Sequence, residues 1–205
     1  MNEFKELQNV MKLRSDEERQ FVAWIKEAKE KGLVTAWDYE PGSWELVPKT
    51  PYTRHVVMKT KIKKTEQHLF HSMSYTPDVV ITLSAEGMVM LDSVLCMAIY
   101  SAKPYNQVYG DIKGTYNPHQ KDTRYFSAMQ KLMYVTHSIW PDKIIPKLLF
   151  KSTWIPEKYR WMKNRKKPTL TKAGKECKTI DEFIKEQKGD ELYKKKLQYC
   201  KKLIK

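Results

Sequence analysis

Apolar residues recur at helical spacing in two segments of the chain, residues 15–31 and residues 119–141. In the first segment Ser15 is a favourable N-cap, Glu18 lies where it can complete a capping box, and Gly32 is a typical helix stop. The positions that predict a buried face are Phe21, Val22, Ile25 and Ala28 in the first segment and Phe126, Met129, Leu132, Met133 and Ile139 in the second. We therefore expect two amphipathic helices.

Shorter apolar runs, bounded by proline and glycine, predict the strands. Residues 33–48 predict two strands joined by a turn at Pro41-Gly42, and residues 52–64 alternate well enough for one further strand. An apolar run within residues 86–107 fits either a strand or a short helix. The remaining strands are expected at residues 75–83, 107–114 and 143–156.

The order of these elements is helix, several strands, helix and strand, which indicates an α/β fold with a mixed central sheet flanked by helices. After Tyr159 the composition changes to a basic linker followed by two short helices, the first of which Thr179 and Glu182 can cap. We expect a core over residues 1–158 and a basic helical extension over residues 159–205.

Positive charge is concentrated at the C-terminal end. The chain carries 38 Lys and Arg against 24 Asp and Glu, a formal net charge of +14. Residues 158–205 hold 17 Lys and Arg against 6 Asp and Glu, a surplus of +11, so the rest of the chain is only mildly basic. Such an excess favours a polyanionic partner, most simply DNA, and a solvated helical face is the alternative interpretation. The residues expected to contact phosphates are Arg160, Lys163, Arg165, Lys166 and Lys167.

The composition favours a cytoplasmic protein without a membrane partner. The cysteines, Cys96, Cys177 and Cys200, have no metal-finger spacing, and their scattered, odd number fits a reducing compartment. The first residues are polar and do not resemble a signal peptide. The longest apolar run, residues 88–100, is interrupted by Asp92 and is too short to span a bilayer.

Three acids and one lysine are candidates for chemistry, namely Glu18, Asp78, Asp111 and Lys113. Asp78 follows a proline at the start of one expected strand. Asp111 and Lys113 lie two residues apart on another, so these two should share one face with Ile112 buried behind them. Carboxylates at neighbouring strand ends can converge on Mg²⁺, which prefers oxygen ligands and retains waters. The cation polarises a phosphodiester and lowers the pKa of a bound water, and a nearby lysine can orient that water. A plain ion pair between Asp111 and Lys113 is the alternative.

Pro77-Asp78 followed by Asp111-Ile112-Lys113 resembles the signature of the PD-(D/E)xK nuclease superfamily. The first predicted helix resembles the opening helix of that fold, which often carries a glutamate one turn from its start. Glu18 takes that position here, with Glu17 as the alternative.

Other segments resemble particular branches of the superfamily. Residues 39–48, YEPGSWELVP, and the Asp-Ile-Lys-Gly run are similar to small phage-encoded members related to Holliday-junction resolvases. Residues 130–134, QKLMY, match the QxxxY element of the RecB-type branch, at Gln130 or alternatively Lys131. The resemblance covers residues 15–150.

The resemblance implies a restriction-endonuclease-like core and a metal-dependent endodeoxyribonuclease, encoded by a phage and acting in the host cytoplasm. Asp78, Asp111 and the Ile112 carbonyl would bind Mg²⁺ or Mn²⁺, and Glu18 would hold a metal-bound water or a second ion. Lys113 would position the attacking water and stabilise the pentacovalent phosphate.

The resemblance further implies that Gln130, or Lys131, contacts the scissile-strand phosphate or the water. The partner would be DNA. A homodimer is an option because many nucleases that cut two strands are dimers, although no dimerisation motif is present.

Three alternatives stay open. Asp78 and Asp111 are separated by about twice the spacing in the compact phage members, so Asp92 competes with Asp78 for the first acid. A basic DNA-binding accessory protein without catalysis would have the same net charge, and a nuclease that cleaves RNA would use the same acids.

Overall fold

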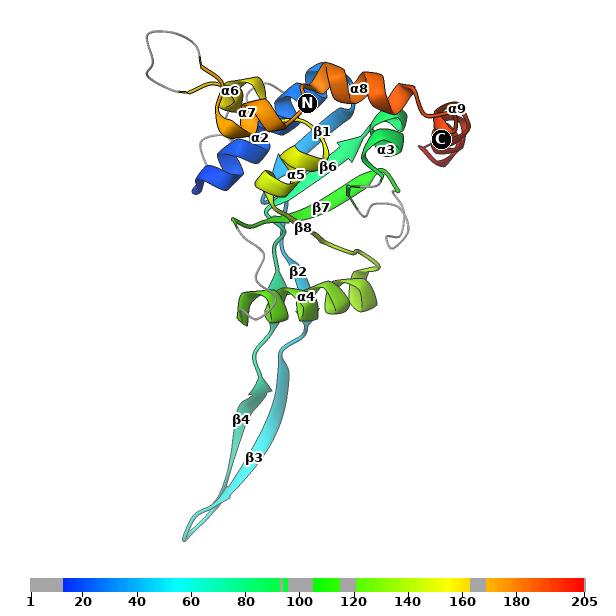
Figure 1. The fold of residues 1–205 in the computed structure, drawn as a ribbon. Helices are drawn as coiled ribbons and strands as arrows, with labels where there is room; N and C mark the ends of the chain where they lie inside the picture. The colour runs from blue at the N-terminus through cyan, green and yellow to red at the C-terminus, as the bar shows by residue number, and fades with distance from the viewer. Residues whose placement is uncertain (1–12, 93, 96–104, 115–120, 163–168, 205) are drawn as a thin grey trace.

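The computed structural model describes residues 13–92, 94–95, 105–114, 121–162 and 169–204. At its centre is a mixed four-stranded sheet in the order β1-β6-β7-β8 (Figure 1). The β1–β6 and β6–β7 pairs are antiparallel and the β7–β8 pair is parallel. The expected α/β fold with a mixed sheet is therefore confirmed. The strands are β1, Val34–Tyr39, β6, Val79–Leu83, β7, Gln107–Ile112, and β8, Asp142–Ile144.

Helix α2, Asp16–Glu30, packs against β1 and β7 and supplies much of the core. The expected capping box is present, because the Ser15 hydroxyl accepts from the Glu18 amide and the Glu18 carboxylate accepts from the Ser15 amide. The Trp24 ring stacks on Trp154 with 4.5 Å between ring centroids, which joins this helix to the C-terminal part of the chain. The buried face of the helix consists of Phe21, Val22, Trp24, Ile25 and Ala28.

The apolar run after β6 begins as a helix, α3, Ala85–Leu91. The Ser84 hydroxyl accepts a hydrogen bond from the Gly87 amide at 3.0 Å and so caps it. Glycine is needed at this position because a Cβ on Gly87 would lie 2.0 Å from the carbonyl oxygen of Leu33. Of the two interpretations left open, the helix is correct for Ala85–Leu91, and residues 96–104 lie outside the described part of the chain.

A smaller unit lies below the main sheet in Figure 1, where strands β2 and β5 pair beside helix α4. Their bounds are Trp44–Val47, Met73–Tyr75 and Lys121–His137. The second amphipathic helix is thus confirmed with narrower bounds. Leu46, Met129 and Met133 form a second buried cluster, so this helix covers the small sheet.

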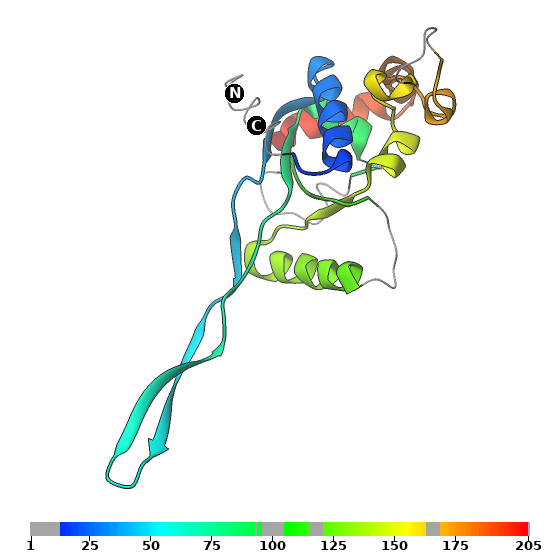
Figure 2. The ribbon, with the colours of Figure 1, turned by 90° about the vertical axis from the view of Figure 1, so that its left-hand side faces the viewer.

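Strands β3, Thr50–Val57, and β4, Ile62–Phe70, form a long hairpin that projects away from both units (Figures 1 and 2). The prediction of one strand over residues 52–64 is wrong, because the chain reverses where the Met58 amide donates to the Lys61 carbonyl at 2.9 Å. The turn contains no glycine, proline or asparagine, the residues by which a hairpin turn is ordinarily recognised.

The predicted strand over residues 143–156 is also wrong beyond Ile144. Helix α5, Pro146–Ser152, follows and has proline at its first turn. Proline fixes φ near the helical value, and its missing N–H would be unsatisfied there in any case. The apolar residues on both sides of Pro146 fit a strand or a helix equally well, so periodicity could not separate them.

The C-terminal helices share the main hydrophobic core. The capping box of α8 at Thr179 and Glu182 is present as expected. Ile180, Phe183 and Tyr193 belong to the same buried cluster as the four-stranded sheet, and α9 packs against α3. The boundary expected near residue 158 therefore separates regions of different charge that share one core. The helices are α6, Glu157–Arg160, α7, Lys172–Glu176, α8, Ile180–Lys188, and α9, Tyr193–Ile204.

No helix in the described part of the chain is both long and apolar enough to cross a bilayer.

Candidate active site

Asp78 and Asp111 face each other across the β6–β7 pair. Asp78 lies one residue before β6, and the register of Val79 with Gly110 places Asp78 opposite Asp111. The Asp78 carboxylate accepts a hydrogen bond from the Ile112 amide at 2.6 Å, and its backbone carbonyl accepts one from Glu40 at 2.9 Å. Asp78 is therefore held by both neighbouring strands, which fixes its position relative to Asp111.

Lys113 completes the group. Its Nζ lies 3.0 Å from Asp111 Oδ2 and 4.0 Å from Asp78 Oδ2. Its backbone amide donates to the Ile144 carbonyl at 2.9 Å, so β8 anchors the residue. The expected placement of Asp111 and Lys113 on one face, with Ile112 buried, is confirmed. The structure thus brings together the predicted acids of two strands and the predicted lysine.

Burial and like charge raise the pKa of the Asp78 carboxyl to about 6, since desolvation and the negative charge of Asp111 both disfavour its ionised form. The hydrogen bond from Ile112 and the charge of Lys113 act in the opposite direction. Asp111 is itself buried. Burial and mutual repulsion make two ionised carboxylates unfavourable here, and a bound cation would relieve both. Groups with a pKa perturbed in this way are typical of functional sites.

Asp92, the alternative to Asp78, lies elsewhere. It is the C-cap of α3, and its charge acts on the Cys200 thiol of α9, where burial and then Asp92 raise the pKa of that thiol. The structure therefore selects Asp78 as the acid beside Asp111.

Both glutamates of the first turn of α2 lie near this group. The Glu18 carboxylate accepts from the backbone amides of Arg14 at 2.6 Å and Ser15 at 3.2 Å, so it caps the helix. Its charge also contributes to the raised pKa of Asp78. A Cβ on Gly114 would lie 3.0 Å from Glu17 Oε1, which places Glu17 directly against the end of the Asp-Ile-Lys-Gly run. Both acids remain candidates.

Two tyrosines border the carboxylates and were not expected. Burial and then Glu18 raise the pKa of Tyr39, with Asp78 contributing. Burial, Asp111 and Asp78 raise the pKa of Tyr75, whose hydroxyl is buried without a hydrogen-bond partner among the described residues. The sequence holds a weak signal, since Tyr75 precedes Asp78 by three residues, but a tyrosine beside a strand is ordinarily a packing residue.

Gln130 and Lys131 lie on α4. The Gln130 amide donates to the Pro141 carbonyl at 2.7 Å, which ties the helix to the segment leading into β8. Lys131 is exposed. The structure gives Gln130 a structural partner, and the contact of either residue with a phosphate or a water stays a prediction.

Arg160, one of the expected phosphate contacts, points into the protein. Only 15% of its side chain is exposed, its Nε lies 3.8 Å from Glu157, and its Nη2 donates to the Gly174 carbonyl at 3.4 Å. A side chain covered in this way is poorly placed to meet DNA, so its position does not support the assignment. Lys163, Arg165, Lys166 and Lys167 lie outside the described residues.

The donor chemistry fits a hard cation, although the ligand set is small. In the described part of the chain, no group of three or more His, Cys, Asp or Glu side chains is arranged to hold a metal ion. Mg²⁺ needs fewer, because it is commonly bound through one or two carboxylates and keeps its waters. Asp78 and Asp111 supply two carboxylates, and the Ile112 carbonyl is the further oxygen that the resemblance implies.

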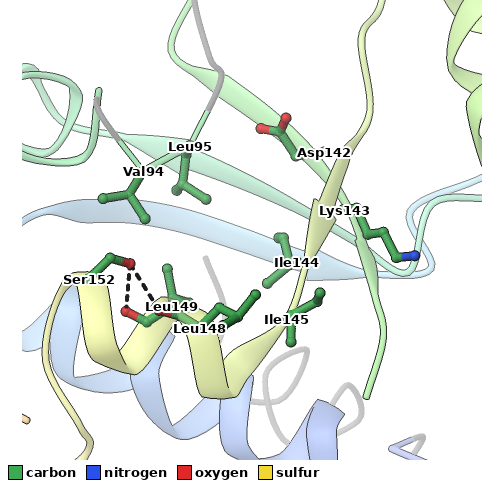
Figure 3. Close-up of a pocket in the computed structure, with 9 residues that line it drawn as sticks. All are labelled: Val94, Leu95, Asp142, Lys143, Ile144, Ile145, Leu148, Leu149 and Ser152. Carbon is green, nitrogen blue, oxygen red and sulfur yellow. Dashed lines mark hydrogen bonds between the residues drawn. The ribbon is translucent and has the colours of Figure 1, made fainter. Parts of the chain in front are cut away.

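A cavity of about 270 Å³ between β8 and α5 is separate from this group (Figure 3). Its lining is mainly aliphatic, from Ile144, Ile145, Leu148 and Leu149, and includes neither Asp78 nor Asp111. The candidate site is instead the group of carboxylates at the ends of the strands.

Comparison of the chain with protein-family models, with curated proteins and with solved structures found no match.

Proposed function

We propose that the chain is a metal-dependent endonuclease of the PD-(D/E)xK type that cleaves DNA. The observation that carries the proposal is the convergence of Asp78, Asp111 and Lys113 at one end of two adjacent strands, with the lysine amine 3.0 Å from Asp111. These are the residues on which the sequence resemblance rests. The order of elements, one helix before the sheet and another between β7 and β8, supports a restriction-endonuclease-like core.

Asp78, Asp111 and the Ile112 carbonyl would hold Mg²⁺ or Mn²⁺. When bound, the cation polarises a phosphodiester and lowers the pKa of a coordinated water. The two strands supply rigid placement, because the Ile112 amide fixes the Asp78 carboxylate at 2.6 Å. The buried position of Asp111 keeps bulk water away from one side of the group.

Lys113 would act on the nucleophile and on the phosphate. Its amine is held at the carboxylates, and 42% of its side chain is exposed, so substrate can reach it. From there it can orient the attacking water and offset the negative charge that develops on the phosphate. Glu17 or Glu18 would receive a hydrogen bond from a water at the same edge.

The partner is proposed to be DNA because of the net charge of +14. Phosphate contacts are assigned to the basic C-terminal region and to Lys131, with Arg160 the weakest member of the set. We further propose that the protein acts in phage DNA recombination, repair or processing in the host cytoplasm, and that two copies act together where both strands are cut.

The test is a cleavage panel with three metals. Linear duplex, single-stranded, flap and four-way-junction DNA, and matching RNA, are incubated with Mg²⁺, Mn²⁺ or Ca²⁺. We expect DNA cleavage with Mg²⁺ and Mn²⁺ and binding without cleavage with Ca²⁺. Asp111→Asn, purified in parallel, should be inactive and excludes a contaminating nuclease, and Asp92→Asn, which makes the same change away from the site, should retain activity.

Two outcomes would overturn the proposal. DNA binding with no cleavage under any metal would favour the accessory protein without catalysis. Cleavage of RNA with none of DNA would keep the metal chemistry and change the substrate.

A further inference from the structure

The β3–β4 hairpin, called the arm below and comprising residues 50–70, buries no core of its own. All its side chains are exposed except Thr50, Thr65 and Gln67, which are half-buried. A two-stranded hairpin with no third strand or covering helix is marginally stable in water. Its exposed apolar residues include Val57, Ile62 and Leu69, at 79%, 63% and 68% exposure. A projection of this kind adds little to the fold, so its surface is available for a partner.

The arm is strongly basic. Residues 50–70 contain five Lys or Arg against one Glu. Four of the cations lie at or next to the turn, namely Lys59, Lys61, Lys63 and Lys64. Among the described residues none of these lysines forms an ion pair. The charge is therefore uncompensated and lies at the part of the molecule farthest from the core (Figures 1 and 2).

The pairing register distributes this charge over both faces. Val56 pairs with Lys63 on one face, and His55 pairs with Lys64 on the other. Val57 pairs with Ile62 beside the turn, so an apolar pair lies among the lysines. Cations on both faces, with one apolar pair beside the turn, suit a ligand that surrounds the ribbon with negative charge, as the two walls of a nucleic-acid groove do.

We propose that the arm inserts its tip into a groove of duplex DNA and so anchors a duplex that runs back along the arm toward the carboxylate site. The major groove of B-DNA is about 12 Å wide and admits a two-stranded ribbon. The eight paired positions of the arm extend about 26 Å at roughly 3.3 Å per residue, enough to reach across the duplex. Lys59, Lys61 and Lys63 would contact phosphates, and Val57 and Ile62 would contact the apolar surface of the groove.

The base of the arm leads directly into the candidate site. Strand β4 is followed by β5, which pairs with β2 in the smaller unit and ends at Tyr75, three residues before Asp78. A duplex gripped by the arm would therefore run toward these carboxylates. A second copy of the chain is the less favoured occupant, because two arms of the same positive charge repel each other.

The inference rests on the proposed function only in taking DNA as the ligand, and it is tested by binding rather than by cleavage. Fluorescence anisotropy of a labelled duplex is measured in Ca²⁺ over a range of NaCl concentrations. The arm variant combines Lys59→Gln, Lys61→Gln and Lys63→Gln. The matched control combines Lys26→Gln, Lys147→Gln and Lys151→Gln, three exposed lysines on α2 and α5.

Each phosphate contact on duplex DNA contributes about −0.9 to the slope of log K against log salt. We expect the arm variant to lose about 2 to 3 units of slope and the control to lose less than about 1. Equal slopes for the arm variant and the wild type, or no binding of duplex by the wild type, would overturn the proposal. A wild type that sediments as a dimer without DNA, and as a monomer after Val57→Ser and Ile62→Ser, would assign the arm to a second copy instead.

Failure of the two proposals is distinguishable. A reduced salt slope with no cleavage under any metal would retain the arm and reject the nuclease. Normal metal-dependent cleavage with an unchanged salt slope would retain the nuclease and reject the arm.

Discussion

Strands β6 and β7 lie inside the four-stranded sheet with neighbours on both sides, whereas β3 and β4 pair only with each other. In the first pair Val79, Ile81 and Val108 are buried in the main core. In the second pair Val57 and Ile62, which face each other across the ladder, are largely exposed. The same antiparallel pairing thus serves as a rigid support in one place and as a free projection in the other.

This structural difference suits the two strand pairs to different functions, the buried pair to catalysis and the exposed pair to binding. Chemistry needs side chains held in fixed geometry, and the buried pair provides it, because the Asp78 carboxylate is fixed by the Ile112 amide of the neighbouring strand. Recognition of an extended partner needs exposed surface, and the arm provides it without loss of core. Changes in the buried pair should therefore alter the rate of cleavage, and changes in the arm should alter binding.

The largest effect is expected at the first acid. Asp78→Ala should lower the rate of Mg²⁺-dependent cleavage by about 10³-fold or more, because loss of a metal ligand costs several kcal/mol of barrier stabilisation. Asp92→Ala removes a carboxylate whose charge acts on Cys200 of α9, and it should stay close to wild type. Single-turnover rates on one DNA substrate measure both variants. An inactive Asp92→Ala beside an active Asp78→Ala would mean that the site is assigned to the wrong acid.

The second largest effect is expected from Lys113→Gln, which should lower the cleavage rate by about 10²–10³-fold. This is the usual loss when one group that stabilises charge in the transition state is removed. The amine is not a metal ligand, so the Mn²⁺ affinity measured by calorimetry should be retained. Metal affinity that collapses together with activity would instead assign Lys113 to holding the two carboxylates in place.

Asp78→Asn should stabilise the metal-free fold at pH 8. The carboxyl pKa is raised from 3.8 to about 6 in the folded state, so folding favours the protonated form. Stability is therefore greatest below the unfolded pKa and falls as the pH rises toward the folded pKa. The cost at pH 8 is on the order of 3 kcal/mol, from a shift of about two pKa units.

Urea unfolding in EDTA at several values from pH 4.5 to pH 8 measures this effect. The gain from Asp78→Asn should grow between pH 4.5 and about pH 6 and then level off. A substitution that destabilises equally at all these pH values would show that the hydrogen bond with Ile112 outweighs the charge.

The parts of the fold that the sequence predicted correctly are those that begin at a recognisable capping residue. Ser15 and Glu18 mark the start of α2, and Thr179 and Glu182 mark the start of α8. The errors have two sources. The arm turns at Met58–Lys61 without a turn residue. At α5 a mark was present, because proline is typical of the first turn of a helix, but the apolar residues around Pro146 are compatible with either type of element.

The same contrast applies to the candidate site. Asp111 and Lys113 could be placed side by side from their two-residue spacing, and the resemblance to the PD-(D/E)xK signature added Asp78 to the same site. Tyr75 could not be predicted, since its proximity to both acids depends on how the small sheet joins the main one. The inward turn of Arg160 depends in the same way on its contact with Gly174 across the basic segment, beside a local ion pair with Glu157.

The smallest effect is expected from removing the arm, and it tests the comparison most directly. Thr50 and Phe70 are paired at the base of the arm, so a short Gly-Ser linker can join these two positions in place of residues 51–69. The free energy of unfolding should change by less than about 1 kcal/mol, because the deleted side chains are almost all exposed and a shorter loop costs slightly less entropy to close. Phe183→Ala, in the C-terminal region, which is also basic, should cost about 3–5 kcal/mol, because Phe183 is 1% exposed in the main core. Urea midpoints and slopes of both variants give the comparison, and cleavage by the shortened chain at low salt checks that the site is intact. A decrease of more than about 3 kcal/mol in the free energy of unfolding on removing the arm would show that the hairpin stabilises the fold. The assignment of structural support to β6–β7 and of binding alone to β3–β4 would then be wrong.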